Sequence, residues 1–316
     1  MPELPEVEYT ARQLRHAIVD ATIAGALVFW QRSIGHPDLP DFLAGIAQSR
    51  ILGVRRRGKF LVMDLEGELL LTIHRRMSGN LLLLPPGWEI DTSLRESDLA
   101  TWDRKGPTFS IRETHSEQQG NQQTIVSSPK TAYCRVCFNL TDGRRLLFTD
   151  PRKFGRIELW PREQEAEALE RLGPEPLSDE FTVESLAQRL VGRRGAIKQV
   201  LLSQEVIAGL GNIYADEALF YARIHPLRRA GSLTVEEVRW LHEGIIAVLT
   251  LGIEHGGTSF NEYRDLWGEA GDNYDHVRVY QQEGKPCPRC GTLIERIVVG
   301  QRGTHFCPTC QKLIPE

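Results

Sequence analysis

The sequence has no long apolar run, no excess of positive charge and only six cysteines. A membrane-spanning helix needs about 20 consecutive apolar residues, and the longest candidate, Ile245 to Ile253, is about half that length. The N-terminus Met-Pro-Glu-Leu-Pro-Glu is acidic, whereas a secretory signal starts with a basic stretch followed by an apolar one. We therefore expect no membrane association and a cytoplasmic location.

The net charge of −4 and the isoelectric point near 6.2 argue, taken alone, against nucleic-acid binding, for which a basic domain is typical. The charges are unevenly distributed, however. Residues 50–59 carry five basic side chains and no acid, whereas residues 158–184 carry nine acids and two arginines. Because a run of like charge is usually a solvated face, the basic segment needs support from other features.

The length of 316 residues and the hydrophobic content of 41% predict roughly two globular domains. Apolar residues at helical spacing predict a helix over 5–19. From 23 to 160, short apolar runs separated by turns predict an antiparallel β-domain. Within it the Gln- and Ser-rich segment 113–131 is expected to be a mobile surface loop.

A segment rich in Gly and Pro, residues 172–176, predicts a boundary after which the pattern becomes helical. Helices are predicted at 182–191, 196–203, 213–222 and 235–254, the last opened by a capping box of Thr234 and Glu237. We see no internal repeat. The predicted fold class is therefore α+β, with a β-domain followed by a mostly helical one.

Four of the cysteines form two C-x2-C pairs separated by sixteen residues: Cys287, Cys290, Cys307 and Cys310. This spacing is typical of a structural zinc site in which each pair donates two thiolates. Disulfides are disfavoured in a reducing cytoplasm. We predict one Zn²⁺, with four protein ligands and therefore no open position for chemistry.

Two further patterns are interpreted as ordinary structure. Cys134 and Cys137 also read C-x2-C, but residues three apart on a strand point to opposite faces, and no second pair is near. Gly209-Leu-Gly211 is part of a dinucleotide-binding fingerprint, yet it follows a predicted helix instead of a strand. A Rossmann-type site is therefore excluded.

Five blocks, in order and over essentially the whole chain, resemble the formamidopyrimidine-DNA glycosylase (Fpg) family: 1–8 (MPELPEVE), 74–79 (HRRMSG), 150–155 (DPRKFG), 208–217 (AGLGNIYADE) and the terminal cysteine pairs. The resemblance implies an N-terminal β-sandwich over 1–165, a helix-two-turn-helix domain over 172–278 and a zinc finger over 279–316. It also implies a monomer that binds damaged double-stranded DNA, excises oxidised purines and cleaves the strand at the abasic site.

The first block makes chemical sense as a nucleophile. Removal of Met1 would expose the secondary amine of Pro2, and an α-amino group titrates near ~8 where lysine titrates near ~10.4, so more of it is free base. Attack at the sugar C1′ would expel the base and leave an iminium for β- and δ-elimination. Glu3 is expected to protonate the sugar ring oxygen, and Glu6 to order water or shuttle protons.

The resemblance assigns DNA contacts to residues in the other blocks. Lys59 matches the lysine that contacts the backbone around the lesion, and Arg302 matches the finger arginine. Asn212 precedes a predicted helix start, where free amides suit a phosphate. Filling the space left by the flipped nucleotide is assigned to Met77, Arg152 and Phe154, with Phe154 as the wedge and Arg152 on the orphaned base.

The chain departs from the family pattern at Arg75-Arg76 and over residues 256–278, the segment that in the family closes over the flipped base. Two alternatives stay open. An endonuclease VIII-like enzyme would prefer oxidised pyrimidines, although the void-filling trio and Leu4 favour Fpg. A zinc-finger DNA-binding protein without catalysis would not need Pro2 beside Glu3.

Overall fold

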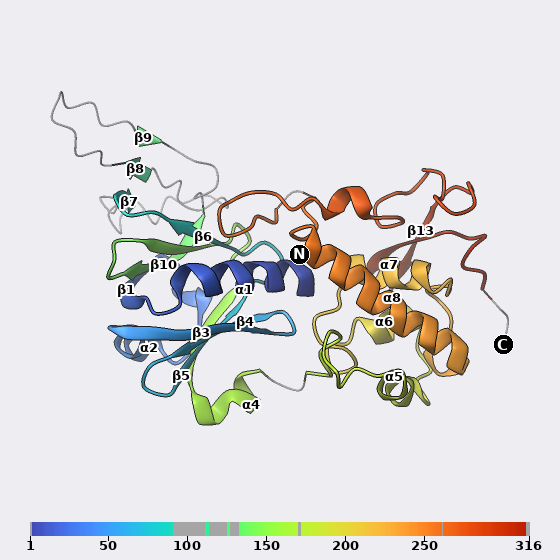
Figure 1. The fold of residues 1–316 in the computed structure, drawn as a ribbon, viewed down its shortest axis with the longest axis horizontal. Coiled ribbons are helices and arrows are strands. Elements are labelled where there is room, and N and C mark those ends of the chain that lie inside the picture. The colour runs from blue at the N-terminus through green and yellow to red at the C-terminus, as the bar shows by residue number, and fades with distance from the viewer. Residues whose placement is uncertain are drawn as a thin grey trace.

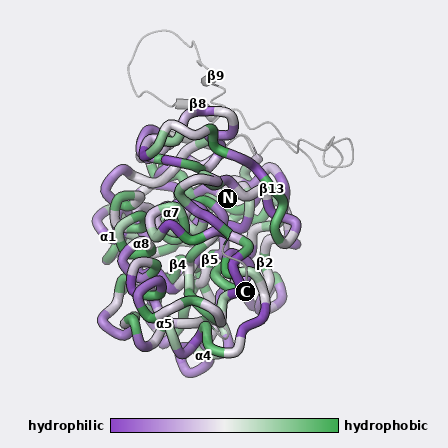
Figure 2. Tube along the Cα trace, turned by 90° about the vertical axis from the view of Figure 1, so that its right-hand side faces the viewer, coloured by the Kyte–Doolittle hydropathy of each residue, from purple (hydrophilic) through white to green (hydrophobic). Residues whose placement is uncertain are grey.

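The computed structural model describes residues 2–90, 111–113, 125–126, 133–169, 172–260 and 262–313. A β-rich half and a helical half lie side by side, and helix α1 starts where they meet (Figure 1). Each half has its own large hydrophobic cluster, and hydrophilic segments gather on the outer turns (Figure 2). The predicted α+β architecture is confirmed, whereas the domain limits at 165, 172 and 278 stay predictions.

The β-half is one nine-stranded sheet that folds into two layers, with strand order β2-β12-β5-β4-β3-β1-β10-β11-β6. The layers join where β1 pairs with β3 through Thr22 and Ile23 alone. Every pairing in this sheet is antiparallel except that of β12 with β2 at one edge, which is parallel. The predicted antiparallel β-domain is confirmed apart from this pair. The strands are β1 Thr22–Val28, β2 Ile34–His36, β3 Ser49–Arg57, β4 Phe60–Leu65, β5 Leu69–His74, β6 Asn80–Leu84, β10 Cys134–Leu140, β11 Arg145–Thr149 and β12 Arg156–Pro161.

Helix α1, Leu4–Ile18, confirms the predicted N-terminal helix. It begins with a capping box of Glu3 and Glu6 and has a proline in its first turn. Its apolar stripe of Val7, Ala11, Leu14 and Ile18 is buried in the same cluster as side chains from both sheet layers. The helix therefore fixes the position of Glu3 relative to the whole β-half.

The sequence patterns missed a helix within the β-half, α2 at Leu39–Ile46. Asp38 caps it by accepting a hydrogen bond from the Asp41 amide at 3.1 Å. A small second sheet contains β7 Trp88–Ile90, β8 Ile111–Glu113 and β9 Ile125–Val126. The expected loop 113–131 therefore includes strand residues at 113, 125 and 126, and its other residues lie outside the described ones.

The helical half contains the four predicted helices, as α5 Val183–Leu190, α6 Ile197–Leu201, α7 Asn212–Tyr221 and α8 Val235–Glu254. The capping box of Thr234 and Glu237 is present. The short helix α4, Glu165–Ala168, precedes this half, and the 3-10 turns are 31–33, 162–164, 230–232 and 273–276. The hairpin of β13, Glu295–Val299, and β14, Arg302–Phe306, follows this half. No helix among the described residues is long and apolar enough to cross a membrane.

The prediction that Cys134 and Cys137 point to opposite faces is wrong. Strand β10 has an irregularity in register between Cys134 and Val136, and a bulge of this kind shifts the alternation of side chains by one residue. Both thiols are consequently buried in one small cluster with Leu82, Leu84 and Leu147. They remain ordinary buried cysteines.

The basic run 50–59 is neutralised by acids of this same chain. Arg55 pairs with Asp64 at 3.2 Å and with Glu165 at 2.7 Å. Glu175, in the Gly- and Pro-rich linker, pairs with Arg56 at 2.6 Å and Arg57 at 2.9 Å and also accepts the Gly58 amide at 2.6 Å. The two oppositely charged runs thus clasp the linker to the β3–β4 turn, which carries Lys59.

The clasp predicts a measurable contribution to stability. Replacing Glu175 by Gln removes the counter-charge that Arg56 and Arg57 share, and Arg56, whose side chain is 8% exposed, keeps within the described residues only Glu8 at 3.0 Å. We expect the free energy of unfolding to fall by about 2 kcal/mol, less than for a fully buried pair because Glu175 is partly solvated. Urea unfolding followed by tryptophan fluorescence measures it.

Glu68→Gln is the matched control, because Glu68 pairs with Arg162 while its side chain is 83% exposed. That change should alter the unfolding free energy by less than about 0.5 kcal/mol. If both substitutions changed the unfolding free energy equally, the ion pairs of Glu175 with Arg56 and Arg57 would not stabilise the protein.

Candidate active site

The carboxylate of Glu3 lies at the N-terminus of α7. Its Oε1 accepts the Ile213 amide at 3.0 Å and its Oε2 accepts the Tyr214 amide at 3.4 Å. Gly211, the residue immediately before α7, has no Cβ. A Cβ at this position would overlap the Glu3 carboxyl group. Amides at the start of a helix stabilise a negative charge. The two hydrogen bonds from α7 therefore favour the ionised form of Glu3.

Burial acts in the opposite direction and is stronger. Glu3 is 1% exposed, and this desolvation raises its pKa above the ordinary 4.5, with the neighbouring Glu6 raising it further. Lys59 and the amide of Ile213 oppose the rise. Lys59 is itself buried, and burial lowers its pKa. The site therefore holds a carboxyl that keeps its proton to higher pH beside a lysine that loses its proton more readily.

Glu6 lies behind Glu3 and is held by groups of this chain. Its Oε1 accepts the Tyr214 hydroxyl at 2.7 Å and the Thr258 amide at 2.8 Å. Its Oε2 accepts the Glu3 amide at 2.7 Å. These bonds hold the N-terminal segment in place, while the expected role of Glu6 in ordering water or shuttling protons stays a prediction.

The segment Gly209-Leu-Gly211 receives the chain's own N-terminus. The Leu4 amide donates to the Gly209 carbonyl at 3.0 Å. Gly209 has φ +83°, and a Cβ there would lie 2.8 Å from the Leu4 Cβ. Both glycines thus permit a close approach of residues 3 and 4. The sequence patterns missed this role, because the partner, Leu4, lies about 200 residues away.

A cavity of about 230 Å³ brings together four of the predicted site residues: Glu3, Met77, Asn212 and Arg302. They come from the N-terminal segment, the turn after β5, the start of α7 and the β13–β14 hairpin between the two cysteine pairs, which we call the zinc hairpin. The segment expected to close over the flipped base also reaches this cavity, through Thr258, Phe260 and Tyr263. Lys59 does not line it, but its charge acts on Glu3.

The structure differs from the sequence expectation at Asn212. The free amides expected at this helix start are occupied, because those of Ile213 and Tyr214 donate to Glu3. The Asn212 side chain donates from Nδ2 to the Gly303 carbonyl at 3.0 Å. Its buried Oδ1 has no partner within the described residues. Asn212 consequently links α7 to the zinc hairpin in this structure.

Asp150 braces the two turns that carry the predicted void-filling residues. Its Oδ1 accepts the Ser78 hydroxyl at 2.5 Å, next to Met77. Its Oδ2 accepts the Gly155 amide at 2.7 Å, next to Phe154. The Phe154 ring is left 52% exposed. Asp150 and Ser78 were not singled out from the sequence, although both lie inside the quoted blocks.

Arg75 explains one departure from the family pattern. It is buried, and its Nε donates to the Gly79 carbonyl at 2.8 Å. Its other nitrogens donate to the Thr10 hydroxyl at 2.9 Å and the Asn80 side chain at 2.6 Å. Its guanidinium also lies 5.1 Å from the Tyr263 ring centre. Arg75 therefore fixes the Met77 turn against α1 and the segment that contains Tyr263.

The four cysteines of the two C-x2-C pairs come together, with all sulfur atoms within 4.8 Å of one another. Cys287 Sγ lies 3.9 Å from Cys310 Sγ, and Cys290 Sγ lies 3.5 Å from Cys307 Sγ. Tetrahedral zinc with bonds of about 2.3 Å requires sulfur separations of roughly 3.8 Å. These residues therefore fit one Zn²⁺, and the predicted structural cofactor is confirmed.

Family models match three parts of the chain. The Formamidopyrimidine-DNA glycosylase N-terminal domain matches residues 1–157, and the Formamidopyrimidine-DNA glycosylase H2TH domain matches residues 172–263. A zinc finger found in FPG and IleRS matches residues 284–313.

Known proteins match over the full length. A Formamidopyrimidine-DNA glycosylase of Roseiflexus is 41% identical and covers 99% of this chain and 100% of its own. Lactococcus lactis Fpg, solved with DNA containing an abasic site, is 30% identical with a TM-score of 0.80 and covers 98% of this chain and 100% of its own. A structure of MutM with DNA containing carbocyclic 8-oxo-G has the same identity and TM-score and covers 99% and 100%.

The sulfur geometry predicts the effect of removing one ligand. Cys307→Ser should lose its zinc to a mild chelator that leaves the metal in the unaltered protein, because an alcohol is a much poorer ligand than a thiolate. Metal analysis after dialysis against EDTA measures the zinc content per chain. Cys137→Ser, which alters a buried cysteine of β10, is the control and should keep its zinc. Full retention in Cys307→Ser would contradict the four-thiolate site.

Proposed function

This chain belongs to the formamidopyrimidine-DNA glycosylase family, the DNA glycosylases that act on damaged DNA in base-excision repair, and we propose that it removes oxidised purines and then cleaves the strand. The substrates we infer are 8-oxoguanine and formamidopyrimidines in double-stranded DNA. One observation carries the proposal: the buried carboxyl of Glu3, next to Pro2, faces a cavity built from both halves of the chain.

The proposed nucleophile is the secondary amine of Pro2 after removal of Met1. Its nitrogen forms a bond to the sugar C1′ while the bond between C1′ and the base breaks. The base leaves with the electron pair of the broken bond. Opening of the sugar ring then leaves an iminium between Pro2 and C1′. This electron sink acidifies the C2′ proton, so that loss of the proton expels the 3′ phosphate and a second elimination expels the 5′ phosphate.

Glu3 is proposed to supply the proton that the sugar ring oxygen needs when the ring opens. A general acid must hold its proton near the working pH, and burial raises the pKa of Glu3 in that direction. Lys59 limits the rise because its positive charge favours the ionised carboxylate. We propose that Lys59 also contacts the DNA backbone near the lesion.

DNA binding is proposed to use Lys59, Asn212 and Arg302 on backbone phosphates and Met77, Arg152 and Phe154 in the space left by the flipped nucleotide. Support for the second group comes from Asp150, which braces both turns, and from the exposed Phe154 ring. Apolar insertion offsets the cost of unstacking, which is a few kcal/mol. For Asn212 the role requires Nδ2 to leave the Gly303 carbonyl.

The lesion class separates this proposal from an endonuclease VIII-like activity. Excision of 8-oxoguanine opposite cytosine, compared with excision of thymine glycol, distinguishes purine from pyrimidine preference. We further propose that the protein works as a monomer in a bacterial cytoplasm, where its DNA substrate lies. The matches to bacterial relatives along their full length support that location.

Borohydride trapping on a duplex containing one 8-oxoguanine tests the proposed chemistry. A preparation with free Pro2 should form a covalent adduct, because borohydride reduces the iminium to a stable amine. A preparation that retains a residue before Pro2 should trap at least about 100-fold less, since its nitrogen is an amide without a free electron pair.

Correct folding of the blocked protein is checked by its zinc content and its affinity for a non-cleavable abasic analogue. Equal trapping by the blocked and free forms would make the Pro2 assignment wrong. Lys59 would then be the candidate nucleophile.

The wedge role predicts a difference between two substrates. Phe154→Ala should slow excision from an 8-oxoguanine duplex by about tenfold or more, about 1.4 kcal/mol in the barrier, because the lesion must be unstacked. Strand cleavage at a preformed abasic site should slow far less. Single-turnover rates on both substrates measure the difference. Trp240→Ala, which removes an exposed aromatic ring of α8, is the control and should change neither rate. If Phe154→Ala slowed both reactions by the same factor, the wedge role would be excluded.

A further inference from the structure

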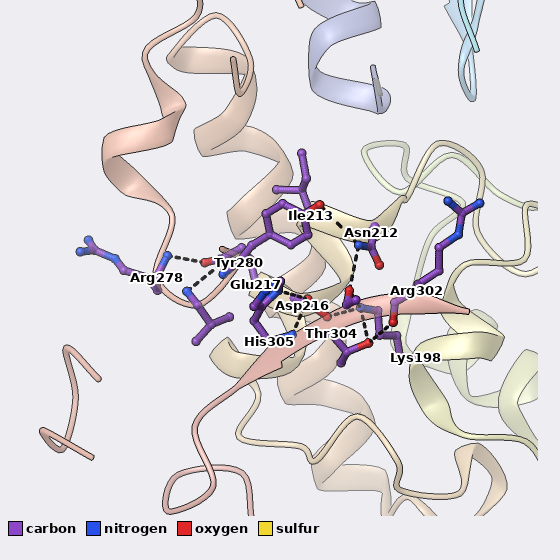
Figure 3. Close-up of polar contacts among 12 residues, drawn as sticks. Lys198, Asn212, Ile213, Asp216, Glu217, Arg278, Tyr280, Arg302, Thr304 and His305 are labelled. Carbon is purple, nitrogen blue, oxygen red and sulfur yellow. Dashed lines mark hydrogen bonds and ion pairs between the residues drawn. The ribbon is translucent and has the colours of Figure 1, made fainter. Parts of the chain in front are cut away.

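Two consecutive acids of α7 hold the C-terminal segments of the chain. Asp216 and Glu217 are 1% and 6% exposed. Asp216 Oδ2 accepts the His305 amide of β14 at 2.9 Å. Glu217 accepts three successive amides, those of Arg278 and Val279 at 2.9 Å and of Tyr280 at 2.8 Å. Figure 3 shows both acids on one helix, facing the zinc hairpin and the segment before it.

Lys198, from α6, completes this cluster. Its Nζ lies 2.6 Å from Asp216 Oδ1, and both side chains are fully buried. The ammonium also donates to the Thr304 hydroxyl at 2.8 Å and to the Gly303 carbonyl at 3.1 Å. An ammonium group has three protons to donate, and each has a partner in this chain. Lys198 is thus a buried cation whose proton donors are all used within this chain, so that none is left for a DNA phosphate.

The contacts of Lys198 lie immediately next to Arg302. Arg302 begins β14, is exposed, and lines the cavity with Glu3. The next residue, Gly303, has its carbonyl held by both Lys198 and Asn212. In Figure 3 the Arg302 side chain extends away from the cluster, while the backbone after it is tied to α6 and α7. The exposed guanidinium of Arg302 thus belongs to the residue directly before Gly303, whose carbonyl is held by buried side chains.

We propose that Lys198 and Asp216 are positioning residues for DNA binding: their buried ion pair holds the backbone at Gly303 and Thr304 so that Arg302 is directed at a backbone phosphate. The inference rests on the proposed contact of Arg302 with DNA. It assigns to Lys198 a role exerted through Arg302, without a contact of its own.

The salt dependence of DNA affinity distinguishes direct from indirect action. Because log K falls as log salt rises, the slope is negative, and each phosphate contact by a cation adds about 0.9 to its magnitude on duplex DNA. Loss of Arg302 from the phosphate should remove that amount. Lys198→Met should remove the same amount, although Lys198 is buried, because Arg302 is no longer held in place.

The experiment measures this slope on a duplex with a non-cleavable abasic analogue for the unaltered protein, Lys198→Met, Arg302→Ala and the double variant. We expect each single variant to reduce the magnitude of the slope by about 0.9 and the double variant to reduce it no further. A double variant that loses about twice that amount would show that Lys198 contacts DNA itself. An unaltered slope in Lys198→Met, with a slope of reduced magnitude in Arg302→Ala, would overturn the inference alone.

An unaltered slope in Arg302→Ala would overturn the Arg302 contact and the inference with it. Lys198→Met leaves Asp216 as an uncompensated buried charge and so weakens folding. The variant Lys198→Met with Asp216→Asn removes both charges and should unfold at nearly the original temperature. The magnitude of its slope should still be about 0.9 lower, because Gly303 and Thr304 lack the ammonium. Recovery of the original slope would reduce Lys198 to a stabilising role and overturn the inference.

Lys312→Met is the matched control for loss of one lysine charge from the same finger. Lys312 is exposed, and its neighbour Gln311 donates to the Ile224 carbonyl, beyond the C-terminal end of α7. Arg302 lies at the other end of that helix. The slope of Lys312→Met should match that of the unaltered protein, and zinc content should be the same in all variants.

Discussion

The hydrogen bonds from the start of α7 to the carboxylate of Glu3 connect the first residues of the chain to its helical half. Glu3 also caps α1. The side chain of Glu3 therefore holds the first turn of α1, which packs in the β-half, against the N-terminus of α7 in the helical half. Gly209 and Gly211 permit the close approach. The position of Pro2, and hence of the proposed chemistry, depends on this joint.

The rest of the site is arranged around the same helix. Its N-terminus holds Glu3, its Tyr214 holds Glu6, and its two buried acids hold the zinc hairpin and the segment at Tyr280. The four cysteines that fit zinc do not line the cavity, so a bound zinc would stabilise the hairpin that carries Arg302, with no open coordination position for chemistry. Buried polar groups of this kind are costly unless they are paired, and the pairs found here determine which segments meet.

Local signals predicted what depends on near neighbours in sequence. The capping box at Thr234, the spacing of the cysteines and the periodicity of α1 were sufficient for those elements. Long-range pairing was not predictable. Glu175, the carboxylate that Arg56 and Arg57 share, lies more than 100 residues along the chain from them, and the amides expected to be free beside Asn212 are occupied by Glu3. The bulge that turns Cys134 to the side of Cys137 has no signal of its own.

The pKa of the Glu3 carboxyl tests the account most directly, because burial, Lys59 and α7 all act on it. A ¹³C NMR titration of glutamate-labelled protein, with the Glu3 signal assigned by its absence in Glu3→Gln, measures that pKa. We predict a value above the ordinary 4.5 and a further rise in Lys59→Met, because the lysine charge favours the carboxylate. A value at or below 4.5, or one that Lys59→Met leaves unchanged, would contradict a buried acid held between two halves of the chain.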